Sequence, residues 1–192
     1  MAKAALNRGA VGVRLDTPAH IRGVRQQTDA PIIGLWKQTL PGYEVYITPR
    51  WSDALAVVEA GADIVALDAT QRDRPEDLAG LITRIHGAGK LVMADVDTPA
   101  AAIAATQAGA DLVSTTLYGY TPSTQNQTPP GFDLLATLVR LPVPAICEGG
   151  IASVPMARQA LELGAYAVVV GTAITGIDLQ VQAYVKGISG MY

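Results

Sequence analysis

Polar side chains follow several short apolar runs of this chain, at the points where buried β-strands would end. Lys37 comes directly after residues 31–36, and Glu148 comes directly after residues 144–147. Four other polar residues end similar runs: Arg14, Asp68, Asp95 and Thr116. A base-like lysine, several carboxylates and an arginine on different strands suit proton transfer on a small anionic substrate. The residue types therefore predict an acid–base site.

The individual residues differ in how strongly they point to function. Glu148 lies in an otherwise apolar run, and charged groups are almost never fully buried unless they are paired. Lys37 taken alone is equally consistent with a surface lysine just past a strand. Asp68 and Asp95 could simply cap the turns that follow them. Arg14 could form a salt bridge with one of these acids.

Two glycine-containing pairs suggest an anion site. Gly149-Gly150 follows the penultimate apolar run, and Gly171-Thr172 follows the last one. Glycine lets backbone amides approach a ligand closely, and phosphate binds in the loops after the last two strands of many parallel barrels. Such turns can also serve only to end strands. Their occurrence after two successive strands favours the phosphate interpretation.

A short sequence repeat indicates the strands and helices that would position these residues. Gly9, Gly61, Gly109 and Gly164 each precede a short apolar run, and they are 52, 48 and 55 residues apart (9 to 61, 61 to 109, 109 to 164). A βαβ motif takes about 30 residues, so each interval holds two βα units. The chemistry of such a parallel array lies at the carboxyl ends of its strands.

Seven strands are predicted, at residues 10–15, 31–36, 64–69, 90–96, 112–117, 144–149 and 167–174. Helix start signals lie between them at Thr17-Pro18, Thr98-Pro99, Ser52 and Ser153, and residues 1–9 read as a helix. Two long connections, 38–49 and 119–131, follow strands on the catalytic side, where long loops are usually functional.

These elements predict an α/β fold, a (β/α)8 TIM barrel of the phosphate-binding type in which strand 1 is missing and residues 1–192 form a single domain. An open seven-stranded sheet is the alternative. A start codon assigned too far downstream, or a truncated gene product, would account for the missing strand, because soluble proteins avoid unpaired edge strands.

Composition narrows the possible partners. Apolar residues make up 49% and charged residues 16% of the chain, the net charge is −3 and the pI is about 5.3. These values argue against nucleic acid or an anionic membrane as the main partner. The chain has one cysteine, Cys147, and its histidines, His20 and His86, lie in helical stretches. We therefore expect a cytoplasmic protein with no disulfide, metal, NAD or ATP.

The chain resembles the N-acetylmannosamine-6-phosphate 2-epimerase family along nearly its whole length. The most specific segments are Tyr46-Ile47-Thr48-Pro49 and the run Thr-Thr-Leu-Tyr-Gly-Tyr-Thr at residues 115–121. Other segments that carry the resemblance are residues 12–14, 31–37, 66–70, 93–95, 148–150 and 164–171. Family members are phosphate-binding barrels that interconvert N-acetylmannosamine 6-phosphate and N-acetylglucosamine 6-phosphate during sialic acid breakdown.

The resemblance implies roles for the residues identified above. Lys37 and Glu148 would be catalytic, and the substrate would be bound by Arg14, Asp95, Thr116 and Tyr120. Phosphate would be bound by Gly149, Gly150, Gly171 and Thr172. Many members carry a basic residue where this chain has Gly150 or Gly176, so backbone amides would hold phosphate here. The resemblance implies no cofactor, a small-molecule sugar phosphate as the partner, and a homodimer.

Two other functions are compatible with the residues. One is a barrel isomerase or synthase acting on another sugar phosphate, as in the phosphoribosyl isomerase and thiamin phosphate synthase relatives. The other is an inactive, truncated barrel that pairs its exposed edges in an oligomer. The tyrosine-containing segments favour the epimerase.

Overall fold

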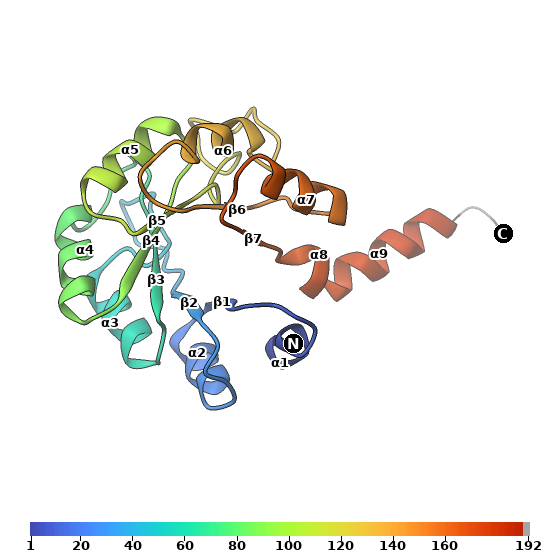
Figure 1. Ribbon diagram of the computed structural model, residues 1–192, viewed down its shortest axis with the longest axis horizontal. Coiled ribbons are helices and arrows are strands. Elements are labelled where there is room, and N and C mark those ends of the chain that lie inside the picture. Colours follow the sequence, from blue (N-terminus) through green and yellow to red (C-terminus); the bar gives the residue numbers. More distant parts are fainter. Residues whose placement is uncertain (190–192) are drawn as a thin grey trace.

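The computed structural model describes residues 1–189 and contains one parallel sheet whose strands follow chain order (Figure 1). Each strand pairs in parallel with the next one along the chain. The strands are β1 (Val13–Asp16), β2 (Ile32–Leu35), β3 (Ile64–Asp68), β4 (Leu91–Asp95), β5 (Leu112–Ser114), β6 (Ala145–Glu148) and β7 (Ala167–Val169).

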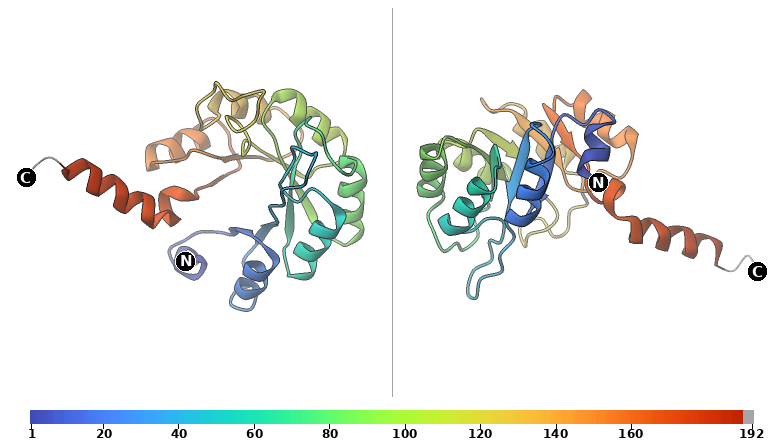
Figure 2. Two further views of the ribbon diagram at one scale, coloured as in Figure 1. Left: turned by 180° about the vertical axis from the view of Figure 1, so that it is seen from behind. Right: turned by 90° about the horizontal axis from the view of Figure 1, so that it is seen from below.

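Helices connect the strands and pack outside them, as Figures 1 and 2 show. Thr17, Thr98 and Ser153 cap their helices through side-chain oxygens, as predicted. The helices are α1 (Ala2–Leu6), α2 (Pro18–Arg25), α3 (Trp51–Glu59), α4 (Leu78–Gly87), α5 (Pro99–Gln107), α6 (Phe132–Leu138), α7 (Val154–Glu162), α8 (Thr172–Thr175) and α9 (Ile177–Ile188).

The sheet curls into a nearly closed barrel, which confirms the predicted fold class with seven visible strands. Among the described residues, β1 and β7 are the two edges of the sheet and do not pair with each other. Figure 1 shows the opening between them, with α1 on one side and α8 on the other. Helix α9 extends away from the barrel, and none of its residues is buried.

The four repeated glycines end helices in the same way. Gly9, Gly61, Gly109 and Gly164 have φ values of 99°, 102°, 103° and 100°. After α3, the Gly61 amide donates to Val58 and the next amide donates to Val57; the other three turns repeat this pair of bonds. This is the Schellman arrangement, which requires a left-handed residue where glycine is favoured. The repeat predicted from sequence is therefore one kind of turn, and the same turn also occurs at Gly89 after α4.

Several predicted boundaries were wrong. Strand β5 ends at Ser114 rather than residue 117, because the chain turns there and the Tyr118 amide donates to the Thr115 carbonyl. The first strand begins at Val13 rather than residue 10, because Val13 is where pairing with Ile32 starts. The last strand ends at Val169, and Thr172–Thr175 coils into α8, since an apolar run does not distinguish strand from helix. Helix α3 begins two residues before the predicted start, with Arg50 rather than Ser52 at its cap, because the Asp53 carboxylate accepts from the Arg50 amide.

Two apolar clusters hold the barrel together. The larger one lies between the helices and the outer face of the sheet. The smaller one fills the barrel interior, and its members are Leu35, Ile47, Ala66, Met93, Leu112, Leu117 and Ile146. Cys147 is buried on β6, as expected. None of the helices described is both long and apolar enough to cross a bilayer.

Candidate active site

The interior apolar residues determine where the polar strand-end residues point. Side chains two positions apart on a strand share a face. Met93 and Ile146 fill the barrel interior, so Asp95 and Glu148, two residues further on, face the same interior at the carboxyl end of the barrel. Leu112 places Ser114 there by the same rule. The interior face of the barrel is therefore apolar along the strands and polar at their carboxyl ends.

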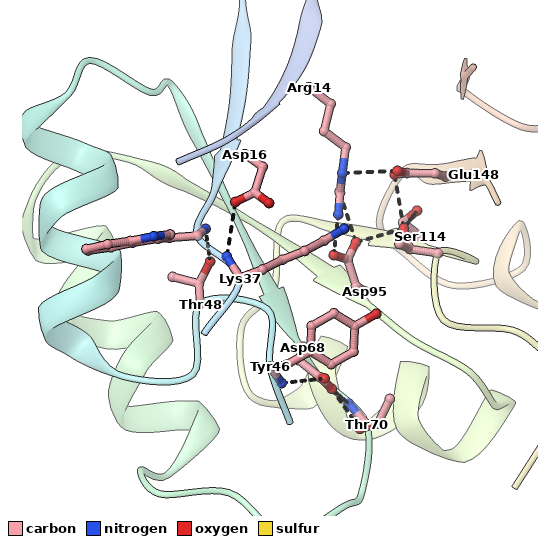
Figure 3. Close-up of polar contacts among 12 residues, drawn as sticks. Arg14, Asp16, Lys37, Tyr46, Thr48, Asp68, Thr70, Asp95, Ser114 and Glu148 are labelled. Atoms are coloured by element: carbon pink, nitrogen blue, oxygen red, sulfur yellow. Dashed lines mark hydrogen bonds and ion pairs between the residues drawn. The ribbon is translucent and has the colours of Figure 1, made fainter. Parts of the chain in front are cut away.

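Arg14 joins three strands of the barrel at this end (Figure 3). Its Nη1 and Nη2 donate to the Asp95 carboxylate at 3.1 and 2.6 Å, and its Nε lies 3.0 Å from Glu148 Oε1. The side chains of Arg14, Asp95 and Glu148 are 8%, 0% and 16% exposed. The expected salt bridge of Arg14 therefore exists, and it engages two acids rather than one. We call these three residues the Arg14 clamp.

Two hydroxyl groups lie beside the Arg14 clamp. Thr116 Oγ1 is 2.9 Å from Asp95 Oδ1 and 3.0 Å from Glu148 Oε2. Ser114 Oγ, which is completely buried, is 2.7 Å from Thr116 Oγ1. Thr115 acts on the backbone instead, since its Oγ1 donates to the Glu148 carbonyl and accepts from the Glu148 amide. Residues 114–116 therefore fix Glu148 from two sides.

Lys37 follows β2 and reaches toward the Arg14 clamp from an exposed position (Figure 3). Its amide donates to Asp16 Oδ1 at 3.1 Å, and Lys37 forms an antiparallel bridge with Ile47. The amide of Gln38 donates to the Tyr46 carbonyl at 2.8 Å. The long connection after β2 therefore folds back on itself, and this fold holds the lysine backbone in place.

Asp68 lies at the end of β3 and organises a second polar group. Its carboxylate accepts from the Tyr46 amide at 3.2 Å, from Thr70 Oγ1 at 2.7 Å and from Arg72 Nη2 at 2.7 Å. The Arg72 guanidinium lies 5.9 Å from the centre of the Tyr46 ring. Among the described residues, Asp68 has no hydrogen bond to the Arg14 clamp. Figure 3 shows the Tyr46 ring between the two groups.

The charges of this region shift the pKa of several groups. Burial raises the pKa of Glu148, and the Asp95 charge adds to that rise, while Arg14 and Lys37 act against it. Burial acts to lower the pKa of Arg14, but its carboxylate partners outweigh this and raise it. Burial and the charges of Asp68 and Asp95 raise the pKa of Tyr46. Glu148 is therefore more readily protonated than an ordinary glutamate.

The residues predicted to bind phosphate lie in the loops after β6 and β7, which are neighbouring strands. Gly150, Gly171 and Thr172 are exposed. Gly150 has φ +70°, and a Cβ there would lie 2.5 Å from Pro129 Cβ. A side chain at this position would therefore require Pro129 to move. Tyr120 is 59% exposed, and its ring lies 3.8 Å from where a Cβ of Gly149 would be.

The structure brings Arg14, Asp95, Thr116 and Glu148 into direct contact, with Lys37 directed at them. It places Asp68 in a separate network, and Tyr120 with the glycines at the rim. Sequence reasoning missed Ser114 and Tyr46 as site residues. Ser114 could have been found because it lies two positions before Thr116, and Tyr46 because it belongs to a specific segment. Among residues 1–189, no group of three or more histidine, cysteine or acidic side chains could hold a metal ion.

Comparison with known proteins finds similarity along nearly the whole chain. The model of a protein family described as "Putative N-acetylmannosamine-6-phosphate epimerase" matches residues 1–190. A protein from Thermosynechococcus vestitus, described as "Putative N-acetylmannosamine-6-phosphate 2-epimerase", is 64% identical over 190 residues, which cover 98% of this chain and 83% of the relative. A second, from Synechococcus elongatus, is 63% identical, with 98% and 84% covered.

A solved structure shares the architecture. The N-acetylmannosamine-6-phosphate 2-epimerase from Clostridium perfringens superimposes with a TM-score of 0.93 at 38% sequence identity. The match covers 96% of this chain and 82% of that one. The similarity therefore extends over the strand ends that carry the polar residues described above.

Proposed function

The chain belongs to the N-acetylmannosamine-6-phosphate 2-epimerase family, whose members are isomerases, and on this premise we propose how its residues perform the reaction. The substrate is N-acetylmannosamine 6-phosphate, and inversion at C2 gives N-acetylglucosamine 6-phosphate. The observation that carries the proposal is the Arg14 clamp, which holds a carboxyl group of raised pKa opposite a lysine at the mouth of the barrel.

Inversion requires a base on one face of C2 and an acid on the other. The C2 proton of the ring-opened sugar is acidic because it lies next to the C1 aldehyde, so its removal leaves an enolate. Lys37 removes or returns the proton on one face, and Glu148 does so on the other. A guanidinium has five N–H groups, and three of those in Arg14 are engaged, so two remain to stabilise the enolate oxygen.

The test follows the C2 proton directly. The purified chain is incubated with N-acetylmannosamine 6-phosphate in deuterated water, and proton NMR should show the second epimer with deuterium at C2. Lys37→Met should abolish both signals. Lys90→Met, at the opposite end of the barrel just before β4, is the matched control and should retain them. Substantial epimerisation by Lys37→Met would reject the lysine role, and silence of the unaltered chain would support the inactive-barrel alternative.

The phosphate group is proposed to bind Gly149, Gly150, Gly171 and Thr172 through backbone amides, with Asp95, Thr116 and Tyr120 contacting the sugar. The exposure of these loops beside Glu148 supports this arrangement. Gly150→Ala should raise KM for the phosphorylated sugar, because its Cβ would meet Pro129 and its φ is strained. The turnover of unphosphorylated N-acetylmannosamine should change much less. Equal effects on both sugars would place phosphate elsewhere.

A wider role follows from this substrate. We propose that the enzyme acts in the cytoplasm, in the breakdown of sialic acids and other amino sugars, as a single barrel domain with no nucleic-acid or membrane partner. Growth on N-acetylmannosamine, restored by this gene in a strain that lacks its own epimerase, would test the pathway. The exposed apolar side chains of α9, such as Val181 and Ile188, support a homodimer, which sedimentation velocity would detect.

A further inference from the structure

Three oxygen atoms surround the Thr116 hydroxyl, and they need more protons than the hydroxyl can supply. They are Ser114 Oγ at 2.7 Å, Asp95 Oδ1 at 2.9 Å and Glu148 Oε2 at 3.0 Å. Ser114 and Asp95 are completely buried. All three separations are hydrogen-bond distances, so each one requires a proton between its two oxygens.

The number of protons available constrains the charge of the two acids. A hydroxyl donates one hydrogen bond, and an ionised carboxylate only accepts. Thr116 can therefore donate to Asp95 or to Glu148, but not fully to both. If it donated to Ser114 instead, neither carboxyl would receive its proton. One of the two carboxyl groups must consequently carry a proton of its own and donate to Thr116.

The neighbours of the two acids identify which one is protonated. Asp95 accepts both Nη groups of Arg14, the bidentate arrangement that holds a carboxylate ionised. Glu148 receives one Arg14 contact, from Nε. The charged groups that face Glu148 are Arg14 from β1, Lys37 after β2 and Asp95 from β4. Burial and the Asp95 charge raise the pKa of Glu148, and they outweigh the lowering effects of Arg14, Lys37 and a hydrogen bond donated by Thr116. The proton belongs on Glu148.

We propose that Thr116 and Ser114 hold Glu148 as a neutral carboxylic acid in the free enzyme. In this arrangement Ser114 donates to Thr116, Thr116 donates to Asp95, and the protonated Oε2 of Glu148 donates to Thr116. Each hydrogen-bonding site of the Thr116 hydroxyl is then used once. Thr116 and Ser114 are therefore positioning residues for Glu148 in the free enzyme, and for Thr116 this role comes in addition to the sugar contact proposed above.

The catalytic meaning of this arrangement rests on the function proposed above. With Glu148 protonated, Glu148 is the acid and Lys37 acts as the base. The lysine lone pair takes the C2 proton, and the C–H electron pair moves into the C1–C2 bond while the carbonyl pair moves to oxygen. Glu148 then delivers its proton to the opposite face of C2. The step leaves an ammonium and a carboxylate, which is the form that acts on the other epimer.

Carbon NMR of the substrate-free protein tests the proposal without any activity measurement. The chain has five glutamates, so a sample labelled with ¹³C at the glutamate carboxyl carbon gives few signals. Glu148→Gln identifies the Glu148 signal, and Glu162→Gln, on α7, is the control that should leave it in place. We expect this signal to keep the chemical shift of a neutral acid at neutral pH. The chemical shift of an ionised carboxylate would overturn the proposal. That result is expected if the Thr116 proton is shared between two ionised carboxylates.

Variants of the hydroxyl groups test the positioning role. Thr116→Val removes the acceptor of the Glu148 proton at equal volume, so the titration midpoint of Glu148 should fall, and Thr116→Ser should restore it. A rise in Thr116→Val would show that Thr116 donates to an ionised Glu148, which overturns the proposal. An unaltered chain that shows a neutral Glu148 but no epimerisation would reject the proposed function and leave this inference standing.

Discussion

Glu148 lowers the free energy of unfolding by an amount that depends on pH. Burial and the Asp95 charge raise its pKa above that of a glutamate in the unfolded chain. As pH rises past the unfolded pKa, the unfolded chain loses this proton first, so folding stability falls until Glu148 also ionises in the folded state. The charge state that suits catalysis is therefore coupled to the stability of the barrel.

Glu148→Gln should remove this pH dependence. Relative to the unaltered protein, the variant should gain stability as pH rises from acidic to neutral, by at most about 1.4 kcal/mol per pH unit. Urea unfolding at several pH values measures the difference, and Glu162→Gln on α7 controls for the loss of one carboxyl group. A difference that shrinks with rising pH would contradict the raised pKa of Glu148.

Asp68 should matter for both stability and turnover. Asp68→Asn leaves the partly buried Arg72 guanidinium without its counter-charge and turns an amide toward donors, which should cost about 1–3 kcal/mol. Turnover should also fall, because the Tyr46 amide loses a carboxylate acceptor. Glu76→Gln breaks the exposed pair with Arg84 and should cost less than about 1 kcal/mol. Equal losses in the two variants would reject this account.

The site was predictable where strand geometry alone decides position. Asp95 and Glu148 end apolar strands, and the carboxyl ends of parallel strands must meet, so their proximity followed from the sequence. Arg14 lies within β1 and reaches the same site through its long side chain. Tyr46 was missed because its place depends on a loop that folds back on Lys37. Ser114 was missed because its role lies in hydrogen bonds between strands, which a small polar residue does not reveal in sequence.

Among the elements, the contact between β2 and the helices beside it leaves no space for a side chain. A Cβ on Gly34 would lie 2.7 Å from both Ala62 and Val57, and 2.9 Å from Ile21. Gly34→Ala should therefore destabilise the barrel by about 1–3 kcal/mol through overpacking. Gly23→Ala, in α2 with no atom within 4 Å, should stabilise it by about 0.5–1 kcal/mol. Thermal unfolding of the two variants tests these opposite signs.

Element order was predictable as well, because seven apolar runs alternated with helix start signals. The boundaries of the first and last strands were less predictable. Val11 is 82% exposed, so the apolar residues before Val13 lie outside the sheet although they read as strand. Residues 170–174 still contain Val170, Ala173 and Ile174, so they read as a continuation of the strand, although the chain turns at Gly171 between β7 and α8.

At the scale of the molecule, burial is unevenly distributed around the barrel. The central strands β3 and β4 are almost entirely buried, whereas every residue of β1 and β7 is partly exposed. Amide hydrogen exchange should therefore be slowest in β3 and β4 and clearly faster in β1 and β7. Mass spectrometry of peptides from each strand measures this order. Protection of β1 equal to that of β4 would mean that something covers the open edge in solution.

The four glycine turns make the chain modular in a way that bears on its descent. Each of these turns precedes an odd-numbered strand, and after the first three turns the next strand along the chain ends in, or is followed by, one chemical group: Lys37, Asp95 or Glu148. A chain that grew by copying one such pair of βα units would inherit the same turn each time, while each copy remained free to change the residue at or after the end of its second strand.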